Sequence, residues 1–205
     1  PKFIKKVSEL VSDHNSLLIA DEVLTGFGRT GSLFAFQQAK IQPDLIAISK
    51  GLTSGFLPMG ITLSKEKIFQ SFVSDSPEKT FWHGHSFTAN PLGCAAAQAS
   101  IDLFANGKWK NKVSVIEEHF SSELESCLKI PEIVDVRVKG AIGVVQLEDE
   151  KHLPWLKQRF VEEGVWVRPF GDIVYLMPAF IVSNKQMFHL TDSIIKVLKE
   201  LFKAY

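Results

Sequence analysis

The sequence has few of the residues that build disulfide networks or metal centres. Cys94 and Cys127 are the only cysteines among 205 residues, too few and too far apart for a disulfide framework or a thiolate metal site. We expect both to be buried, reduced thiols. His83 and His85 are two positions apart, a spacing that would place both imidazoles on one face of a strand as possible metal ligands. No third ligand lies near them in the sequence, so we expect no metal.

The sequence also lacks net charge and long hydrophobic runs. Its 23 basic residues balance 23 acidic ones, so no long-range field attracts nucleic acid or an anionic membrane. No apolar run approaches the roughly 18 residues that span a bilayer, and neither end has a secretory signal pattern. These absences favour a cytoplasmic protein that acts on small molecules, with no nucleic-acid or membrane partner.

The composition is that of a globular protein, with 45% apolar and 22% charged residues. The chain contains no internal repeat and no low-complexity linker. It begins at Pro1, without a methionine, at the start of a helical pattern over residues 3–11. This beginning predicts further sequence upstream.

Residues 1–104 alternate between helical and buried-strand patterns. The run 17–20 is continuously apolar, as expected of a strand covered on both faces in a parallel sheet, and similar runs occupy 45–48 and 60–63. An alanine-rich helix should begin at Pro91 and stop at Asn106-Gly107. The pattern predicts an α/β domain.

The pattern of short strands and helices in residues 105–205 predicts a separate, smaller α+β domain. A hairpin with one helix-covered face is expected around the Lys139-Gly140 turn. The other predicted elements are helices over 113–128, 152–163 and 184–202, and strands over 165–168 and 173–177.

Charged residues follow two of the predicted strands. Asp21 ends the first run and Lys50 follows the second, 29 positions later (50 minus 21), which leaves room for a crossover to a neighbouring strand. Ligands of open α/β sheets bind beyond the carboxyl ends of the strands. Each residue alone also fits a simpler role, Asp21 as a loop residue or helix cap and Lys50 as a solvated lysine.

Several blocks of sequence in order resemble class III, fold type I aminotransferases, which depend on pyridoxal 5'-phosphate. The resemblance covers essentially the whole chain. Its main blocks are Leu18-Ile19-Ala20-Asp21-Glu22-Val23, Gly26-Phe27-Gly28-Arg29-Thr30-Gly31, Pro43-Asp44 through Ser49-Lys50-Gly51, and Phe81 through Leu92. The resemblance implies that residues 1–104 are the C-terminal part of the large mixed-sheet domain, followed by a small C-terminal α+β domain.

The resemblance makes Lys50 the Schiff-base lysine that carries pyridoxal 5'-phosphate. Transamination needs an amine that bonds to the cofactor, yields it to the substrate and then moves a proton, and Lys50 suits these tasks. A buried carboxylate raises the pKa of the pyridine nitrogen and keeps it protonated. Asp21 is the predicted carboxylate.

Residues 84–86 resemble the phosphate-contacting loop of the family. There, His85 and Ser86 would bind the cofactor and Gly84 the substrate, and because this loop reaches the neighbouring subunit, the resemblance implies a homodimer with shared active sites. Family members often carry threonine in place of Ser86 and sometimes proline in place of His85. A simpler alternative is that Ser86 or Thr88 caps the following helix.

Blocks at 137–145, 164–171 and 175–178 narrow the resemblance to family members of biotin biosynthesis. Those enzymes transfer an amino group from S-adenosylmethionine to 8-amino-7-oxononanoate. Arg168 would bind the keto acid's carboxylate through two hydrogen bonds, and Arg29 and Tyr175 would line the substrate site. All three residues also fit structural roles.

Family members are about twice as long as this chain. The resemblance implies a missing N-terminal half that supplies a Gly-Ser phosphate turn, an aromatic ring stacked on the cofactor and part of the substrate pocket. We therefore expect residues 1–205 alone to be inactive. Two alternatives remain: another class III aminotransferase that uses an ω-amino acid, ornithine or an amine, or a non-catalytic half that pairs with a complementary chain.

Overall fold

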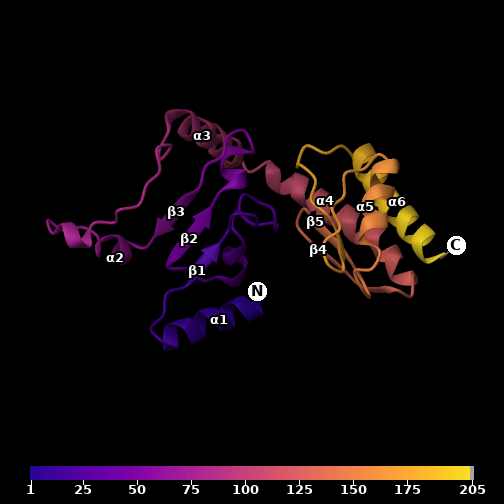
Figure 1. The fold of residues 1–205 in the computed structure, drawn as a ribbon, viewed down its shortest axis with the longest axis horizontal. Helices are drawn as coiled ribbons and strands as arrows, with labels where there is room; N and C mark the ends of the chain where they lie inside the picture. Colours follow the sequence, from indigo (N-terminus) through magenta and orange to yellow (C-terminus); the bar gives the residue numbers. More distant parts are fainter. Residues whose placement is uncertain (204–205) are drawn as a thin grey trace. The chain divides into compact units, whose positions relative to one another are not determined.

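The computed structural model describes residues 1–203. The chain forms two compact units, Pro1–Lys108 and one that begins at Trp109, a division close to the predicted boundary between residues 104 and 105. Each unit has its own three-stranded sheet (Figure 1).

The sheet of the first unit has the strand order β1-β2-β3. Its strands are β1 (Ile19–Asp21), β2 (Leu45–Ile48) and β3 (Ile61–Ser64), close to the three predicted runs. β1 and β2 are parallel, with Asp21 opposite Ala47. β3 runs antiparallel to β2, so the sheet is mixed, as the resemblance implied.

The predicted burial of these strands on both faces is wrong. Ile19 in β1 is 63% exposed and Leu63 in β3 is 43% exposed. The buried core of this unit gathers instead around the carboxyl end of β2, where Ile48 and Leu52 pack with Phe27 and Ala97. A continuously apolar run shows that a strand can be covered, but its cover must come from other segments, and here they reach only one end of the sheet.

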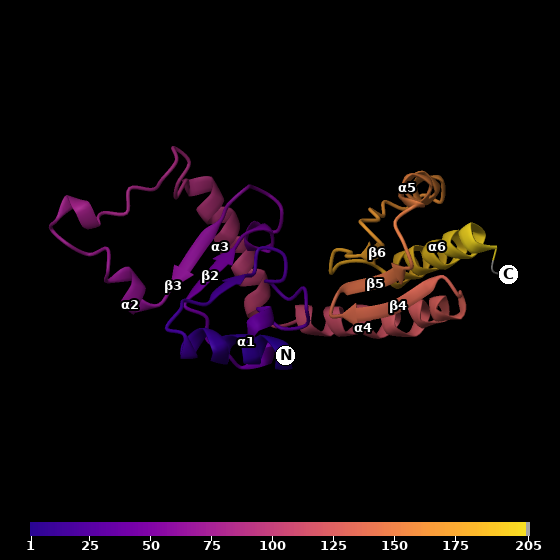
Figure 2. The ribbon, with the colours of Figure 1, turned by 60° about the horizontal axis from the view of Figure 1, so that its bottom comes forward.

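Helix α1 (Lys2–Asp13) covers the predicted helical pattern over residues 3–11, and none of its residues is buried. The short helix α2 (Glu66–Phe69) begins a long segment that extends away from the sheet before the chain returns in α3 (Figures 1 and 2).

Helix α3 (Pro91–Ala105) has the predicted limits. Asn90 caps its first turn by accepting a hydrogen bond from the Gly93 N–H at 2.7 Å, and Gly107 follows with a positive φ of 70°. The buried residues of α3 are small ones at helical spacing: Gly93, Ala97 and Ser100.

The two cysteines differ from one another. Cys127 is buried, as predicted, and burial raises the pKa of its thiol to about 11. Cys94 is exposed, which contradicts the prediction. It lies next to Gly93 on α3, one residue away from the packed face, because helical spacing turns each residue by about 100°.

The second unit is an antiparallel sheet in the order β4-β5-β6 with helices packed on it (Figure 2). Its elements are α4 (Trp109–Leu124), β4 (Ile133–Lys139), β5 (Ile142–Leu147), α5 (Leu153–Glu162), β6 (Ile173–Leu176) and α6 (Asn184–Phe202). A Cβ built on Gly143 would lie 2.8 Å from Leu124 Cδ1 and 3.0 Å from Phe120 Cδ2. This close approach of α4 to the hairpin confirms the helix-covered face.

The predicted strand over residues 165–168 is wrong. The segment is extended, with Val165 and Val167 buried and Trp166 and Arg168 exposed, but it pairs with no strand in the part of the chain that the structure describes. Alternation of side chains requires only an extended backbone, whereas a strand also requires a partner for its N–H and C=O groups.

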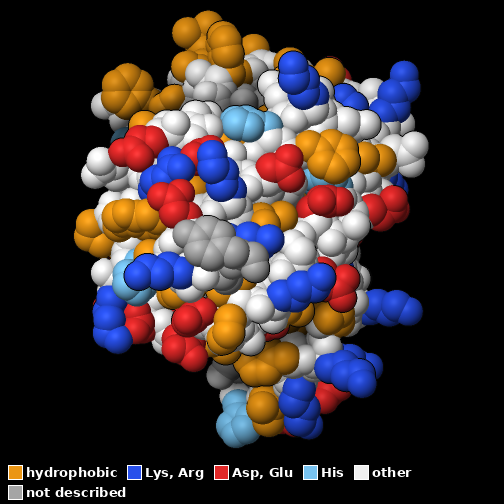
Figure 3. All heavy atoms as spheres, turned by 90° about the vertical axis from the view of Figure 1, so that its right-hand side faces the viewer, with side chains coloured by type: hydrophobic (Ala, Val, Ile, Leu, Met, Phe, Trp, Pro, Cys, Tyr) orange, Lys and Arg blue, Asp and Glu red, His pale blue; other side chains and the backbone are white. Residues whose placement is uncertain are grey.

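Among residues 1–203, no helix has the length and apolar character needed to cross a membrane. Acidic and basic side chains are interspersed on the face shown in Figure 3, in keeping with the balanced charge of the sequence.

Candidate active site

Asp21 and Lys50 lie at the same edge of the first sheet. β1 and β2 are parallel, so their carboxyl ends meet there. The N–H of Glu22 donates to the Ala47 carbonyl at 2.8 Å, which extends the pairing beyond Asp21. Lys50 follows two residues after Ile48, the last residue of β2. The structure thus brings together the amine and the carboxylate that the sequence singled out.

Asp21 is exposed, not buried as predicted, while the next residue, Glu22, is only 2% exposed. Strand geometry turns the two carboxylates to opposite sides. The Asp21 Oδ1 accepts a hydrogen bond from the Val23 N–H at 3.0 Å, which orients the carboxylate. No described side chain covers Asp21 closely enough to bury it, so its exposure follows from its place at the open end of the strand.

Glu22 is a structural residue of the site that the sequence analysis did not identify. Its Oε1 accepts from the Phe36 N–H at 2.9 Å and its Oε2 from the Thr25 hydroxyl at 2.5 Å. These bonds tie the loop after β1 to the strand. The sequence did contain a signal for a buried carboxylate, because Asp21 and Glu22 are adjacent acidic residues. Side chains alternate along a strand, so one of two neighbours faces inward.

The backbone at Lys50 is strained. Its φ is +39°, in the left-handed region that costs most residues other than glycine free energy. The preceding Ser49 donates its hydroxyl to the Met59 carbonyl at 2.6 Å, and the Leu52 N–H donates to the Ser49 carbonyl at 2.8 Å. These contacts hold the turn that presents the exposed Lys50 side chain.

Helix α3 supports this turn through Ser100. The buried Ser100 hydroxyl donates to the Gly51 carbonyl at 3.0 Å and lies 2.8 Å from the Ser54 hydroxyl. A Cβ on Gly51 would lie 2.8 Å from Phe27 Cβ, so only glycine fits next to Lys50. No sequence pattern pointed to Ser100, because 49 residues separate it from Gly51.

Ser100→Ala should therefore destabilise the protein. The half-buried Gly51 and the exposed Ser54 would lose their hydrogen bonds to Ser100, at a cost of about 0.5 to 1.5 kcal/mol in the free energy of unfolding. Urea unfolding followed by circular dichroism measures this loss. The control is Ser121→Ala on the exposed face of α4, where a change within about 0.5 kcal/mol is expected. Equal effects of both variants would contradict the supporting role of Ser100.

Arg29 lies in the glycine-rich loop that follows β1. Three residues of this loop have positive φ: Phe27 at 58°, Gly28 at 87° and Gly31 at 95°. Arg29 is half-buried, and burial lowers the pKa of its guanidinium because desolvation disfavours the charged form. Its loop begins directly after Asp21 and Glu22, so Arg29 belongs to the same unit as Asp21 and Lys50.

Gly84, His85 and Ser86 lie in the exposed segment that precedes α3. His85 Nδ1 accepts from the Phe87 N–H at 3.1 Å. Among residues 1–203, no hydrogen bond joins residues 84–86 to Asp21 or Lys50. The alternative that Ser86 or Thr88 caps the helix is wrong, because Asn90 is the cap.

Arg168 and Tyr175 belong to the second unit. Arg168 is exposed, with its Cζ 5.3 Å from the centroid of the Trp166 ring. Tyr175 is half-buried in β6, opposite Val144 of β5. The predicted site residues are therefore divided between the two units.

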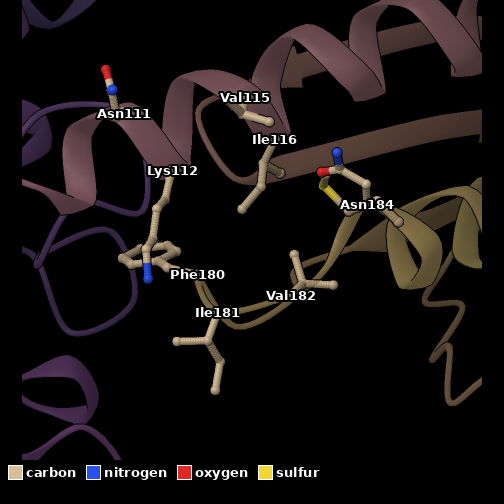
Figure 4. A pocket seen from close by; sticks show the side chains of 9 residues that line it. Asn111, Lys112, Val115, Ile116, Phe180, Ile181, Val182 and Asn184 are labelled. Carbon is tan, nitrogen blue, oxygen red and sulfur yellow. The ribbon is translucent and has the colours of Figure 1, made fainter.

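A pocket of about 300 Å³ in the second unit is separate from all these residues (Figure 4). It lies between the start of α4 and the segment before α6, and its lining includes Lys112, Ile116, Phe180 and Met187. Its walls are mostly apolar and none of the predicted site residues contributes to them. The candidate site is therefore the edge of the first sheet, where Asp21 and Lys50 follow the carboxyl ends of two neighbouring strands.

The sequence and the fold both match known aminotransferases. The chain is 41% identical to the adenosylmethionine-8-amino-7-oxononanoate aminotransferase of Synechococcus elongatus, over 98% of this chain and 48% of that protein. It is 39% identical to the enzyme of the same name from Corynebacterium glutamicum, over 89% and 43%. The chain thus spans about half the length of the curated relatives it matches.

Two solved structures are similar along nearly the whole chain. The enzyme of the same name from Methanocaldococcus jannaschii has a TM-score of 0.87 at 29% identity, over 97% of this chain and 49% of that one. An (S)-enantioselective omega-transaminase from Thermomicrobium roseum has a TM-score of 0.88 at 28% identity, over 95% and 46%. The fold is that of the fold type I enzymes that use pyridoxal phosphate. The family model of class III aminotransferases matches residues 1–198, and this chain belongs to that family.

Proposed function

We propose that the protein is a cytoplasmic aminotransferase that transfers an amino group from S-adenosylmethionine to 8-amino-7-oxononanoate in biotin biosynthesis. The observation that carries the proposal is the shared sheet edge of Lys50 and Asp21, in a chain 41% identical to an aminotransferase named for these two compounds. This chain covers 48% of that relative. The complete enzyme that we propose would therefore also contain an N-terminal half.

The residues at the sheet edge fit pyridoxal 5'-phosphate. Lys50 offers an exposed amine on a strained, well-supported turn, and Asp21 offers a carboxylate oriented by the Val23 N–H. When bound, the cofactor supplies an electron sink for the bonds at the substrate's reacting carbon. Lys50 would hold the cofactor through Nζ and, once released, accept and return the proton of that carbon. Asp21 would keep the pyridine nitrogen protonated.

Gly84, His85 and Ser86 would act on the site of a second copy of the chain. Their segment is exposed and extends away from the sheet (Figures 1 and 2), and within their own copy they form no hydrogen bond to Asp21 or Lys50. The Ser86 hydroxyl and the backbone N–H groups would bind the cofactor phosphate, together with His85, while Gly84 would border the substrate. This arrangement requires a homodimer with shared active sites.

Substrate roles are proposed for three residues that the resemblance singled out. We assign residues 1–104 to the large cofactor-binding domain and residues 105–205 to the small domain. The planar guanidinium of Arg168 would bind the carboxylate of 8-amino-7-oxononanoate through two N–H groups. Arg29, in the loop after Asp21, and Tyr175, in β6, would line the rest of the substrate site.

Arg168→Lys tests the substrate assignment. Lysine keeps the positive charge but loses the two-pronged geometry, and a charge-assisted pair contributes about 1.5 to 3 kcal/mol. The KM for 8-amino-7-oxononanoate should therefore rise roughly tenfold to a hundredfold in steady-state assays of the dimeric holoenzyme. Cofactor content, measured by absorbance, should stay unchanged.

The methyl ester of the keto acid is the control compound for this variant. It lacks the carboxylate, so the wild-type enzyme and the Arg168→Lys variant should bind it about equally. If the variant binds the keto acid and its methyl ester more weakly by the same factor, Arg168 is a structural residue and another group binds the carboxylate.

A second candidate function is an aminotransferase with another amino donor. The similarity to the omega-transaminase of Thermomicrobium roseum, at a TM-score of 0.88, favours it. Donor assays of the full protein separate the two: turnover with S-adenosylmethionine supports our proposal, whereas turnover only with amines, ornithine or ω-amino acids supports the second. A chain that binds no cofactor in the full assembly would instead be a non-catalytic partner.

A further inference from the structure

We propose that Trp166 is a positioning residue that orients the Arg168 guanidinium for the carboxylate of the keto substrate. This inference rests on the proposed role of Arg168 and adds a residue to which the sequence pattern assigned no function. It starts from the alternation of buried and exposed residues along 165–170.

The backbone of this segment is fixed to the second unit at both ends. Val165 and Val167 are 4% and 5% exposed, and the Val165 N–H donates to the Phe160 carbonyl at 3.0 Å. At the other end, Phe170 and Ile173 exchange two backbone hydrogen bonds of 2.9 and 3.0 Å. The outward residues therefore stay on one face: Trp166, Arg168 and Phe170.

On that face the Arg168 Cζ lies 5.3 Å from the centroid of the Trp166 ring. This distance is within the range of cation–π contacts, in which tryptophan is the strongest aromatic partner. The Trp166 ring is 73% exposed. Because the backbone is anchored at both ends of the segment, the Trp166 ring is held beside the Arg168 cation before any ligand binds.

The two contacts of the guanidinium are geometrically compatible. An aromatic ring contacts the face of the planar group, whereas a carboxylate binds the N–H groups at its edge. An exposed arginine without such a contact samples many rotamers and must lose that freedom when it binds a ligand. The Trp166 ring restricts the side chain before the substrate arrives, so less conformational entropy is lost on binding.

Trp166→Leu tests this role in the dimeric holoenzyme. Leucine keeps an apolar side chain but has no π face, so the KM for 8-amino-7-oxononanoate should rise about twofold to fivefold, as expected for an exposed cation–π contact. The kcat and the KM for the amino donor should change less than about twofold. Trp166→Phe, which restores an aromatic face, should recover at least half of the loss.

Trp155→Leu is the matched control. Trp155 is also an exposed tryptophan of the second unit, on α5, and its substitution should leave the KM for the keto acid unchanged. Both variants should unfold at nearly the wild-type temperature, because surface substitutions change stability little.

A double-mutant cycle with Arg168→Ala separates this inference from the assignment of Arg168. If Trp166 acts through Arg168, Trp166→Leu has no further effect on KM in the Arg168→Ala background. A persistent effect there means that Trp166 contacts the substrate itself, and no effect in either background means that the ring is inert; both results overturn the inference while the role of Arg168 stands. If Arg168→Ala itself leaves KM unchanged, the proposed carboxylate site fails and the inference fails with it.

Discussion

Lys50→Ala should lower kcat of the proposed dimeric holoenzyme by roughly 10³-fold to 10⁶-fold, as expected when a covalent catalyst loses its nucleophile. Lys50 is proposed both to hold the cofactor and to move the proton of the reacting carbon, and alanine can do neither. The turn that presents Lys50 is held by hydrogen bonds of Ser49 and Ser100, which alanine at position 50 leaves in place. Steady-state assays with saturating cofactor measure the loss.

A second readout identifies the bonded residue directly. Borohydride reduction of the wild-type holoenzyme, followed by peptide mass spectrometry, should place the cofactor label on the peptide that contains Lys50. The control is Lys67→Ala on α2, an exposed lysine of the same unit, which should keep activity and label. Retention of more than about one per cent of activity in Lys50→Ala would contradict the assignment.

Asp21→Asn should lower kcat by roughly tenfold to a thousandfold while the cofactor stays bound. A carboxylate beside a cationic nitrogen shifts its pKa by about 1 to 3 units, and the neutral amide gives up that shift. The sign follows from the charge: without the carboxylate the pKa of the pyridine nitrogen falls, so less of it is protonated at neutral pH. The rate should therefore recover in part as the pH is lowered.

Asp13→Asn is the matched control for this variant. Asp13 ends α1 and is exposed, so its substitution removes the same charge without touching the sheet edge. The pH dependence of kcat distinguishes the two variants, because only Asp21→Asn should shift the profile toward acid. An unaltered rate and profile in Asp21→Asn would mean that another group faces the pyridine nitrogen.

Several elements were predictable because their cause is local. Helix α6 occupies the predicted 184–202, since its apolar residues recur at helical spacing and Ser183 caps its first turn. β2 occupies the predicted 45–48 for a similar reason, a short apolar run after Pro43 and Asp44. The proximity of Asp21 and Lys50 followed from one further rule, that carboxyl ends of adjacent parallel strands share an edge.

The wrong predictions share a different cause. Cys94 was expected to be buried, residues 165–168 were expected to form a strand, and the strand with Ile19 was expected to be covered on both faces. Each outcome depends on which other segment packs there, and composition and spacing do not specify that segment. The structure left Cys94 and Ile19 exposed and residues 165–168 without a partner strand.

The sequence by itself determined three features: the periodic elements, the family, and the amine and carboxylate at the strand ends. Each depends on residues that are close together in the chain. Only the tertiary structure decided that Ser100 supports the Lys50 turn from 49 residues away, that Glu22 is buried and Asp21 exposed, and that Trp166 lies within cation–π distance of an arginine proposed to bind substrate. These are contacts between side chains whose directions depend on packing, and packing is a property of the folded chain as a whole.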